Sequence, residues 1–157
     1  MKYVNTGVVF QEIPDEVTLS INISNCPCHC LGCHSEYLWR DIGEPLNVMS
    51  LGEMLKQYGD DITCVAFMGG DATPAEVNNL AAWVRKTYPE LSIAWYSGRA
   101  LLSNEIYLGN FDYVKLGPYV ERLGPLNQRT TNQRLYKIQK DQTMKDITSK
   151  FWKKQMG

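Results

Sequence analysis

The sequence predicts an α/β fold, a partial, open and shortened TIM-like (β/α) barrel. An alternating segment at residues 17–24 and apolar, β-branched runs at 62–67, 91–96 and 111–116 are typical of strands. Helix-like segments lie between these runs, and the alternation of strand and helix favours parallel strands joined by right-handed crossovers. A complete eight-stranded barrel takes about 250 residues. A chain of 157 residues therefore builds only part of one.

A single domain accounts for residues 1–157. The chain is 44% hydrophobic, with 12 Gly and 7 Pro, and is long enough to bury one core. We expect the core strands and helices at 17–120 and a C-terminal segment at 121–157. The net charge of -1 gives no electrostatic reason to expect nucleic acid or an anionic membrane as partner. No apolar run approaches the roughly 20 residues of a membrane helix, so we expect a soluble protein.

The first core strand shows a period of two. Leu19, Ile21 and Ile23 alternate with polar residues, as in a half-buried strand. Upstream, residues 8–10 and the turn at Pro14–Asp15 favour an antiparallel hairpin that leads into this strand.

Two helices carry N-terminal signals. Ser50 and Glu53 form a capping-box pattern ahead of a short helix with Met54 and Leu55, and residues 73–76 do the same for a longer helix. The longer helix has an inward stripe of Val77, Leu80, Ala81 and Val84.

Two further helices are expected from the order of elements and from spacing. The alternation of strand and helix requires a third helix between 91–96 and 111–116. In the C-terminal segment, Met144, Ile147 and Phe151 share one face of a predicted helix, which we expect to pack on its own domain.

The densest chemical motif is a run of cysteines that follows the first core strand. Four of the five cysteines fall within eight residues: Cys26, Cys28, Cys30 and Cys33. They bunch rather than spread along the chain, and the N-terminus does not read as a signal peptide, so we expect a reducing, cytoplasmic location. Cys64, inside an apolar strand, is expected to be a small buried hydrophobe.

The spacing of these cysteines favours an iron-sulfur cluster over zinc. Structural zinc sites usually close with two separated ligand pairs, and no second Cys or His pair exists in this chain. A 4Fe-4S cube takes thiolates at separate irons, so the C-x3-C-x2-C spacing of Cys26, Cys30 and Cys33 suits three irons and leaves one open. A zinc knuckle that uses Cys28 and a redox disulfide loop remain as alternatives.

The ends of the predicted strands form a candidate site. Chemistry in barrel folds sits at the C-terminal ends of the strands. Here those ends are the cysteine loop, Met68–Asp71, Ser97–Arg99 and Gly117–Tyr119. Gly69 and Gly70 let a ligand approach the backbone closely, because neither has a Cβ, and Asp71 adds a carboxylate. These residues, with Ser97 and Gly98, are candidates for binding a cluster-bound cosubstrate, although tight turns would also explain them.

The motifs at the strand ends resemble those of the radical S-adenosylmethionine (SAM) superfamily. The matching segments are Cys26-x3-Cys30-x2-Cys33, Gly69-Gly70-Asp71, Trp95-Tyr96-Ser97-Gly98 and Thr131-Asn132-Gln133-Arg134. Over most of its length, the chain is similar to the short activating proteins of anaerobic ribonucleoside-triphosphate reductases. Larger radical SAM enzymes usually carry an aromatic residue before the third cysteine, where this chain has Gly32.

The resemblance implies a barrel of the radical SAM type with two cofactors. Cys26, Cys30 and Cys33 would hold a 4Fe-4S cluster, and SAM would chelate the open fourth iron. The residues implied beside SAM are Gly32, Cys33, His34, Gly69, Gly70, Asp71 and Ser97. Asn132 and Gln133 would line the site or dock the partner, although polar capping of a last strand would also explain them. The resemblance requires no side-chain acid or base.

The resemblance also implies an activity and its partners. Reduced flavodoxin or ferredoxin would supply an electron, and SAM would be cleaved to methionine and a 5′-deoxyadenosyl radical. That radical would generate a glycyl radical on the anaerobic (class III) ribonucleoside-triphosphate reductase. An activase of another glycyl-radical enzyme, a small-molecule radical SAM enzyme and a non-catalytic metal-binding module remain as alternatives. Where many relatives carry Asp, this chain has Leu116, preceded by Lys115.

Overall fold

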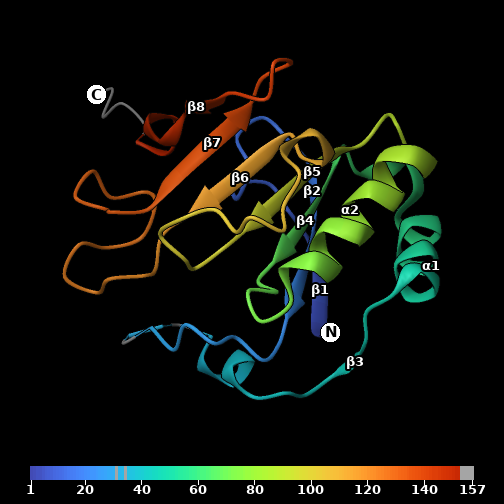
Figure 1. Cartoon of the computed structure of the whole chain (residues 1–157), viewed down its shortest axis with the longest axis horizontal. Coiled ribbons are helices and arrows are strands. Elements are labelled where there is room, and N and C mark those ends of the chain that lie inside the picture. Colours follow the sequence, from blue (N-terminus) through green and yellow to red (C-terminus); the bar gives the residue numbers. More distant parts are fainter. Residues whose placement is uncertain (31, 34, 153–157) are drawn as a thin grey trace.

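The computed structural model describes residues 1–30, 32–33 and 35–152. Its centre is one eight-stranded sheet in the order β3-β1-β2-β4-β5-β6-β7-β8 (Figure 1). The strands are β1 Lys2–Val9, β2 Thr18–Ile23, β3 Glu44–Pro45, β4 Cys64–Met68, β5 Ser92–Tyr96, β6 Tyr113–Leu116, β7 Arg134–Ile138 and β8 Met144–Asp146. The α-helices among the described residues are α1 Val48–Tyr58 and α2 Pro74–Thr87. Short 3-10 helices are η1 Glu36–Trp39, η2 Gly59–Asp61, η3 Leu108–Asn110 and η4 Thr148–Phe151.

The four central strands are parallel and the flanking strands are antiparallel. β2, β4, β5 and β6 pair side by side in chain order, so their C-terminal ends meet at one edge of the sheet. β1 pairs antiparallel with β2, which is the hairpin that the sequence predicts. β7 and β8 extend the other side, also antiparallel. The sheet is therefore open and mixed, and its relation to a TIM-like barrel stays a prediction.

The N-terminal cap of α1 differs from the predicted one. Asn47 is the cap: its Oδ1 accepts from the backbone N–H of Ser50 at 3.0 Å, and its own N–H donates to Ser50 Oγ at 3.0 Å. The predicted pairing of Ser50 with Glu53 is wrong, because the helix starts earlier and Ser50 is the third helical residue. In α2, Pro74 is the first residue and the predicted stripe is buried, but the Thr73 side chain makes no capping bond.

The third crossover contains no α-helix. Every residue between β5 and β6 is described, and the only regular element there is the 3-10 turn η3. Asn78 of α2 holds this connection, since its Oδ1 accepts from the backbone N–H of Tyr107 at 2.8 Å and from Asn110 Nδ2 at 3.1 Å. The predicted third helix is wrong, because the Asn78 side chain of α2 anchors a turn that contains Gly109 and Asn110.

The two faces of the sheet are covered by different parts of the chain. The face that carries Val65, Phe67 and Trp95 packs against α1 and α2 (Figure 1). The opposite face carries small residues such as Ala66 and Ala94, and it packs against a turn and the C-terminal segment through Ile13 and Ile147. None of the helices among the described residues combines the length and apolar composition that crossing a bilayer requires.

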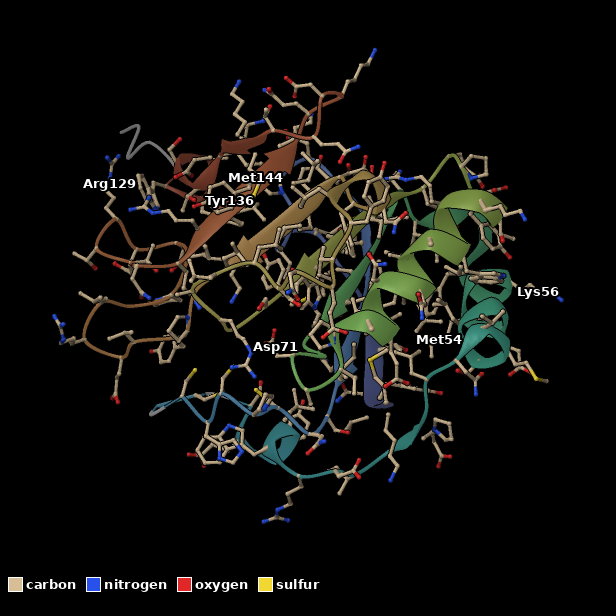
Figure 2. The ribbon with its side chains drawn as sticks, viewed as in Figure 1. Met54, Lys56, Asp71, Arg129, Tyr136 and Met144 are labelled. Atoms are coloured by element: carbon tan, nitrogen blue, oxygen red, sulfur yellow. The ribbon has the colours of Figure 1, made fainter. Side chains whose placement is uncertain are left out.

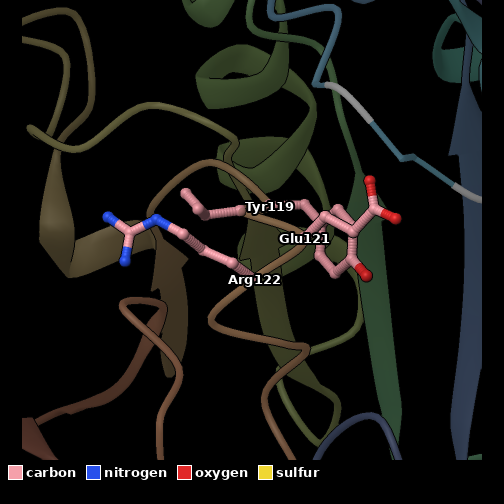
Figure 3. A pocket seen from close by; sticks show the side chains of 4 residues that line it. Tyr119, Glu121 and Arg122 are labelled. Carbon is pink, nitrogen blue, oxygen red and sulfur yellow. The ribbon is translucent and has the colours of Figure 1, made fainter.

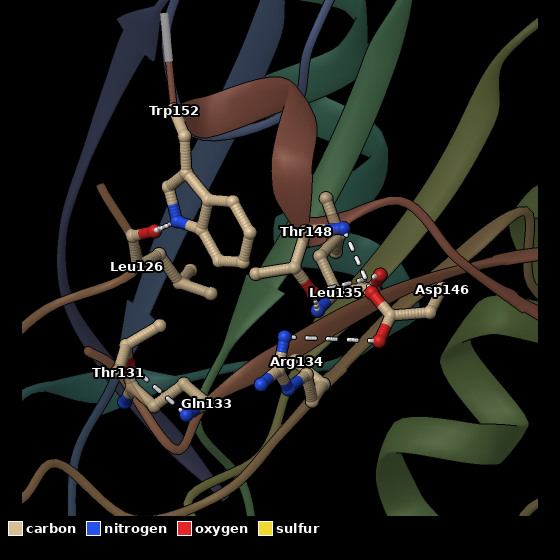
Figure 4. Close-up of polar contacts among 8 residues, drawn as sticks. All are labelled: Leu126, Thr131, Gln133, Arg134, Leu135, Asp146, Thr148 and Trp152. Carbon is tan, nitrogen blue, oxygen red and sulfur yellow. Dashed lines mark hydrogen bonds and ion pairs between the residues drawn. The ribbon is translucent and has the colours of Figure 1, made fainter. Parts of the chain in front are cut away.

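The C-terminal segment is a strand and a 3-10 turn rather than the predicted helix. β8 pairs with β7, and Thr148 at the start of η4 accepts from the backbone N–H of Leu135 at 2.8 Å (Figure 4). Trp152 donates from Nε1 to Leu126 O at 3.0 Å. Pairing with the free edge of β7 satisfies backbone groups that a helix would satisfy internally, so the helical spacing of this segment is overridden.

Candidate functional site

Asp71 joins the ends of two central strands. It follows β4, is only 4% exposed, and its Oδ1 accepts from Ser97 Oγ at 2.5 Å. Its Oδ2 accepts from the backbone N–H of Gly98 at 2.8 Å. Figure 2 shows Asp71 between the central strands and the loop that leaves β2. The predicted site residues after β4 and β5 are therefore in direct contact.

Cys28 brings the cysteine loop to the same point. Its Sγ lies 3.7 Å from Asp71 Oδ2. A Cβ at Gly98 would lie 2.8 Å from the same sulfur, so position 98 requires glycine for this approach. Burial, and after it the charge of Asp71, raises the pKa of the Cys28 thiol to about 12. Without a bound metal this thiol stays protonated at neutral pH.

The rest of the cysteine loop is held by backbone and ring contacts. Cys26 N–H donates to Leu38 O at 2.9 Å, and Cys33 N–H donates to Cys30 O at 3.0 Å. The ring of His29 stacks on Trp39 of η1, with centroids 4.7 Å apart. The four loop cysteines form no disulfide in this structure and are partly exposed, whereas Cys64 is fully buried, as the sequence predicts.

Gly32 lies against the connection between β6 and β7. Its φ is +78°, and a Cβ at this position would lie 2.5 Å from Glu121 Oε2. Glu121 also lines a cavity of about 620 Å³ with Tyr119, Val120 and Arg122 (Figure 3). A side chain larger than glycine just before Cys33 would displace Glu121. His34, also predicted for this site, lies outside the described residues.

Gly69 and Gly70 form the turn after β4 with φ values of +112° and +93°. Gly69 N–H donates to Tyr96 O at 3.0 Å, and its carbonyl accepts from Trp95 Nε1 at 2.7 Å. A Cβ at Gly70 would lie 2.5 Å from Val77 Cγ2. The two glycines therefore bring the start of α2 close to the site.

Asn132 and Gln133 lie at the start of β7, beside the end of β6. Asn132 Nδ2 donates to Pro118 O at 3.1 Å, and Gln133 Nε2 donates to Gly117 O at 3.4 Å. Within the described part of the chain, Asn132 Oδ1 is buried without a hydrogen-bond partner. The two residues hold the turn after β6, and Asn132 keeps one acceptor for a ligand or water.

The sequence prediction missed two residues of this region. Lys115 is only 7% exposed, and its Nζ donates to Gly117 O at 3.1 Å. Trp39 has a buried Nε1 donor with no acceptor among the residues that the structure describes. The position of Lys115 within an apolar run was a sequence signal for it, because unpaired lysines are rarely buried. No local sequence pattern singled out Trp39.

The donors of this region fit an iron-sulfur cluster better than a single metal ion. In the described ranges, no three His, Cys, Asp or Glu side chains converge as the ligands of one ion do. A 4Fe-4S cube takes one thiolate per iron, so its ligands surround a larger space than those of one ion, and its sulfurs accept hydrogen bonds. Four thiols in one loop and the free N–H of Trp39 beside His29 match these requirements.

The fold and the site define an α/β protein with a thiol-rich loop at the C-terminal ends of parallel strands. A family model described as "4Fe-4S single cluster domain" matches residues 16–139. The chain therefore belongs to this family and is an iron-sulfur protein with a 4Fe-4S cluster. No curated protein and no solved structure matches the chain.

Proposed function

We propose that this chain is a radical SAM activase that generates a glycyl radical on an anaerobic ribonucleoside-triphosphate reductase. The observation that carries the proposal is the meeting of three strand ends: Cys28 of the cysteine loop contacts Asp71, which binds Ser97 and Gly98. Family membership accounts for the cluster. A Gly-Gly-Asp turn and a Ser-Gly turn beside it supply the polar backbone that a cluster-bound cosubstrate needs.

Three cysteines of the loop would hold the cluster, namely Cys26, Cys30 and Cys33. SAM would occupy the open iron through its amino and carboxylate groups. Its neighbours would be Gly32, Cys33, His34, Gly69, Gly70, Asp71 and Ser97. When bound, the cluster would supply the electron for reductive cleavage of the SAM sulfonium to methionine and a 5′-deoxyadenosyl radical. Asp71, anchored by Ser97, would position the amino group, and no side chain acts as acid or base.

The open sheet favours a protein as substrate, and we propose that it is a shortened barrel of the radical SAM type. A closed barrel would enclose a small molecule, whereas an open one leaves room for a peptide loop. On the face away from the helices, a cavity of about 780 Å³ extends from Phe10 to Tyr96 and Gln133. A glycine-bearing loop of the reductase fits such a surface, and reduced flavodoxin or ferredoxin would supply the electron.

Anaerobic reconstitution tests this function. The protein is loaded with iron and sulfide, reduced, and mixed with SAM, with and without the reductase. We expect methionine and 5′-deoxyadenosine, and an electron paramagnetic resonance signal of a glycyl radical only when the reductase is present. Intact SAM after reduction of a protein with a full complement of iron and sulfide would contradict the proposal. SAM cleavage without a glycyl radical in the reductase would exclude this partner.

A second candidate function is electron transfer by a cluster with four cysteine ligands. Cys28 favours it, because a fourth thiol lies in the same loop and reaches the strand ends. A cluster closed by four thiolates has no open iron for SAM. This candidate predicts a reducible cluster that leaves SAM intact.

A further inference from the structure

Lys115 is a buried cation that the proposed function does not use. It lies on β6, and its backbone carbonyl accepts from the N–H of Ser97 at 2.9 Å. Ser97 in turn binds Asp71, whose other oxygen lies beside the thiol of Cys28. Ser97 and Asp71 therefore link the backbone of Lys115 to the cysteine loop, and its ammonium lies at the end of β6, on Gly117 O. Its ammonium also lies 5.5 Å from the centroid of the Tyr96 ring, so it is on the face away from the helices.

Little of the protein compensates this charge. An ammonium has three N–H donors, and within the described residues Gly117 O is its one hydrogen-bond acceptor. Lys115 also takes part in no ion pair with a described residue. Its burial removes most of the water that solvates the ammonium of an exposed lysine. Burying a lysine costs several kcal/mol unless an anion lies nearby. A retained buried ammonium therefore indicates that negative charge faces it in the working protein.

The acidic groups whose charge would act on Lys115 all belong to the candidate site. Burial lowers the pKa of Lys115 to about 8, and the groups that oppose this shift are Asp71, Cys30, Cys28 and Cys26. The lysine thus stays largely protonated at neutral pH. Three of these four groups are cysteine thiols of the loop, which are anionic as thiolates bound to a metal.

We propose that Lys115 is a positioning residue that acts as the counter-cation of the 4Fe-4S cluster and raises its reduction potential. The inference depends on the cysteine loop holding the cluster, as proposed above, but not on SAM chemistry. One electron from a reduced flavodoxin or ferredoxin makes the site more negative by one charge. A fixed ammonium in a weakly polar environment stabilises that reduced form relative to the oxidised one, because the Coulomb energy is poorly screened there. Cluster potentials depend on such local charge and on solvent exposure.

Redox titration of three variants tests this role. Lys115→Met removes the charge and keeps a similar length, Lys115→Arg keeps the charge, and Lys137→Met removes a charge from an exposed position on β7. Each protein is reconstituted anaerobically, and its midpoint potential is measured by electron paramagnetic resonance without SAM or reductase. We expect a more negative midpoint for Lys115→Met and a midpoint close to the unsubstituted protein for the other two.

Equal midpoints in Lys115→Met and the unsubstituted protein, at equal iron content, would overturn the inference. An equally large shift in Lys137→Met would also overturn it, because the effect would then be one of net charge. If Lys115→Met does not fold, Lys115→Gln provides the same comparison. Because SAM is absent, failure of the radical SAM proposal would leave this result intact.

Discussion

Asp71 is the residue through which two strand ends and the cysteine loop meet. Both of its carboxylate oxygens are occupied, one by Ser97 and the other by Gly98 and Cys28. A turn aspartate would normally face water. Here it is buried, and its hydrogen bonds hold the site together before any ligand arrives. The contact with Cys28 makes that residue the most informative cysteine to substitute.

Substitution of single cysteines separates ligands from the remaining thiol. Cys30→Ser removes one proposed thiolate ligand, so we expect a large loss of bound iron and sulfide after reconstitution, because a serine hydroxyl binds iron more weakly than a thiolate. Cys28→Ser should keep the cluster. Iron and sulfide per chain measure both. If Cys28→Ser loses the cluster as completely as Cys30→Ser, the site has four cysteine ligands and the electron-transfer function is favoured.

At the scale of elements, the N-termini of α1 and α2 differ in their capping hydrogen bonds, and the sequence does not predict this difference. Asn47 and Ser50 exchange two hydrogen bonds at the start of α1, while Thr73 makes none at the start of α2. Both segments carry residues typical of caps. Rotation of a single side chain decides whether the capping bond forms, and sequence does not specify that rotation.

This difference predicts unequal effects of two matched substitutions. Asn47→Ala should lower the free energy of unfolding by about 1 kcal/mol, because it leaves a helix N–H without its acceptor. Thr73→Ala removes no capping bond, so its effect should stay within about 0.5 kcal/mol, as is usual for such positions. Urea denaturation monitored by circular dichroism measures both. Equal losses in the two variants would contradict this account of the caps.

At the scale of the whole molecule, the face of the sheet away from the helices buries several weak acids. Burial, and after it the charge of Glu16, raises the pKa of Cys64 well above its ordinary value of 9.0. Burial also raises the pKa of Tyr96 and of Tyr113, both on neighbouring strands. The unfolded chain therefore loses these protons first as pH rises. The stability that they contribute is complete below pH 9 and falls at higher pH.

Cys64→Ala isolates one of these contributions. Above pH 9, the folded protein keeps the Cys64 proton while the unfolded chain loses it. The free energy of unfolding should therefore fall less steeply in the variant, by about 1.4 kcal/mol per pH unit. Urea denaturation in a pH series measures the two slopes. Parallel slopes would show that the folded protein does not hold this proton. The smaller side chain also lowers the free energy of unfolding at every pH, but that loss does not change the slope.

Local sequence patterns predict much of this architecture. The period of two at Leu19, Ile21 and Ile23 and the apolar runs that follow identified the four central strands, because burial on one or both faces imposes that pattern directly. The connection at 97–112 and the C-terminal segment were misread as helices. In the first case a hydrogen bond from Asn78 holds a turn where the order of elements predicts a helix, and in the second case pairing with β7 outweighs the helical spacing.

The sequence by itself determined that the chain is an iron-sulfur protein, because four thiols in one short loop are a local property and a 4Fe-4S family model matches residues 16–139. That Cys26, Cys30 and Cys33 are the ligands stays a prediction. The sequence also indicated which strand ends carry polar and glycine residues. Only the tertiary structure decided that Cys28 contacts Asp71 and that Lys115 is buried. Contacts of that kind join residues far apart in the chain, and they depend on strand register and packing, which no local pattern specifies.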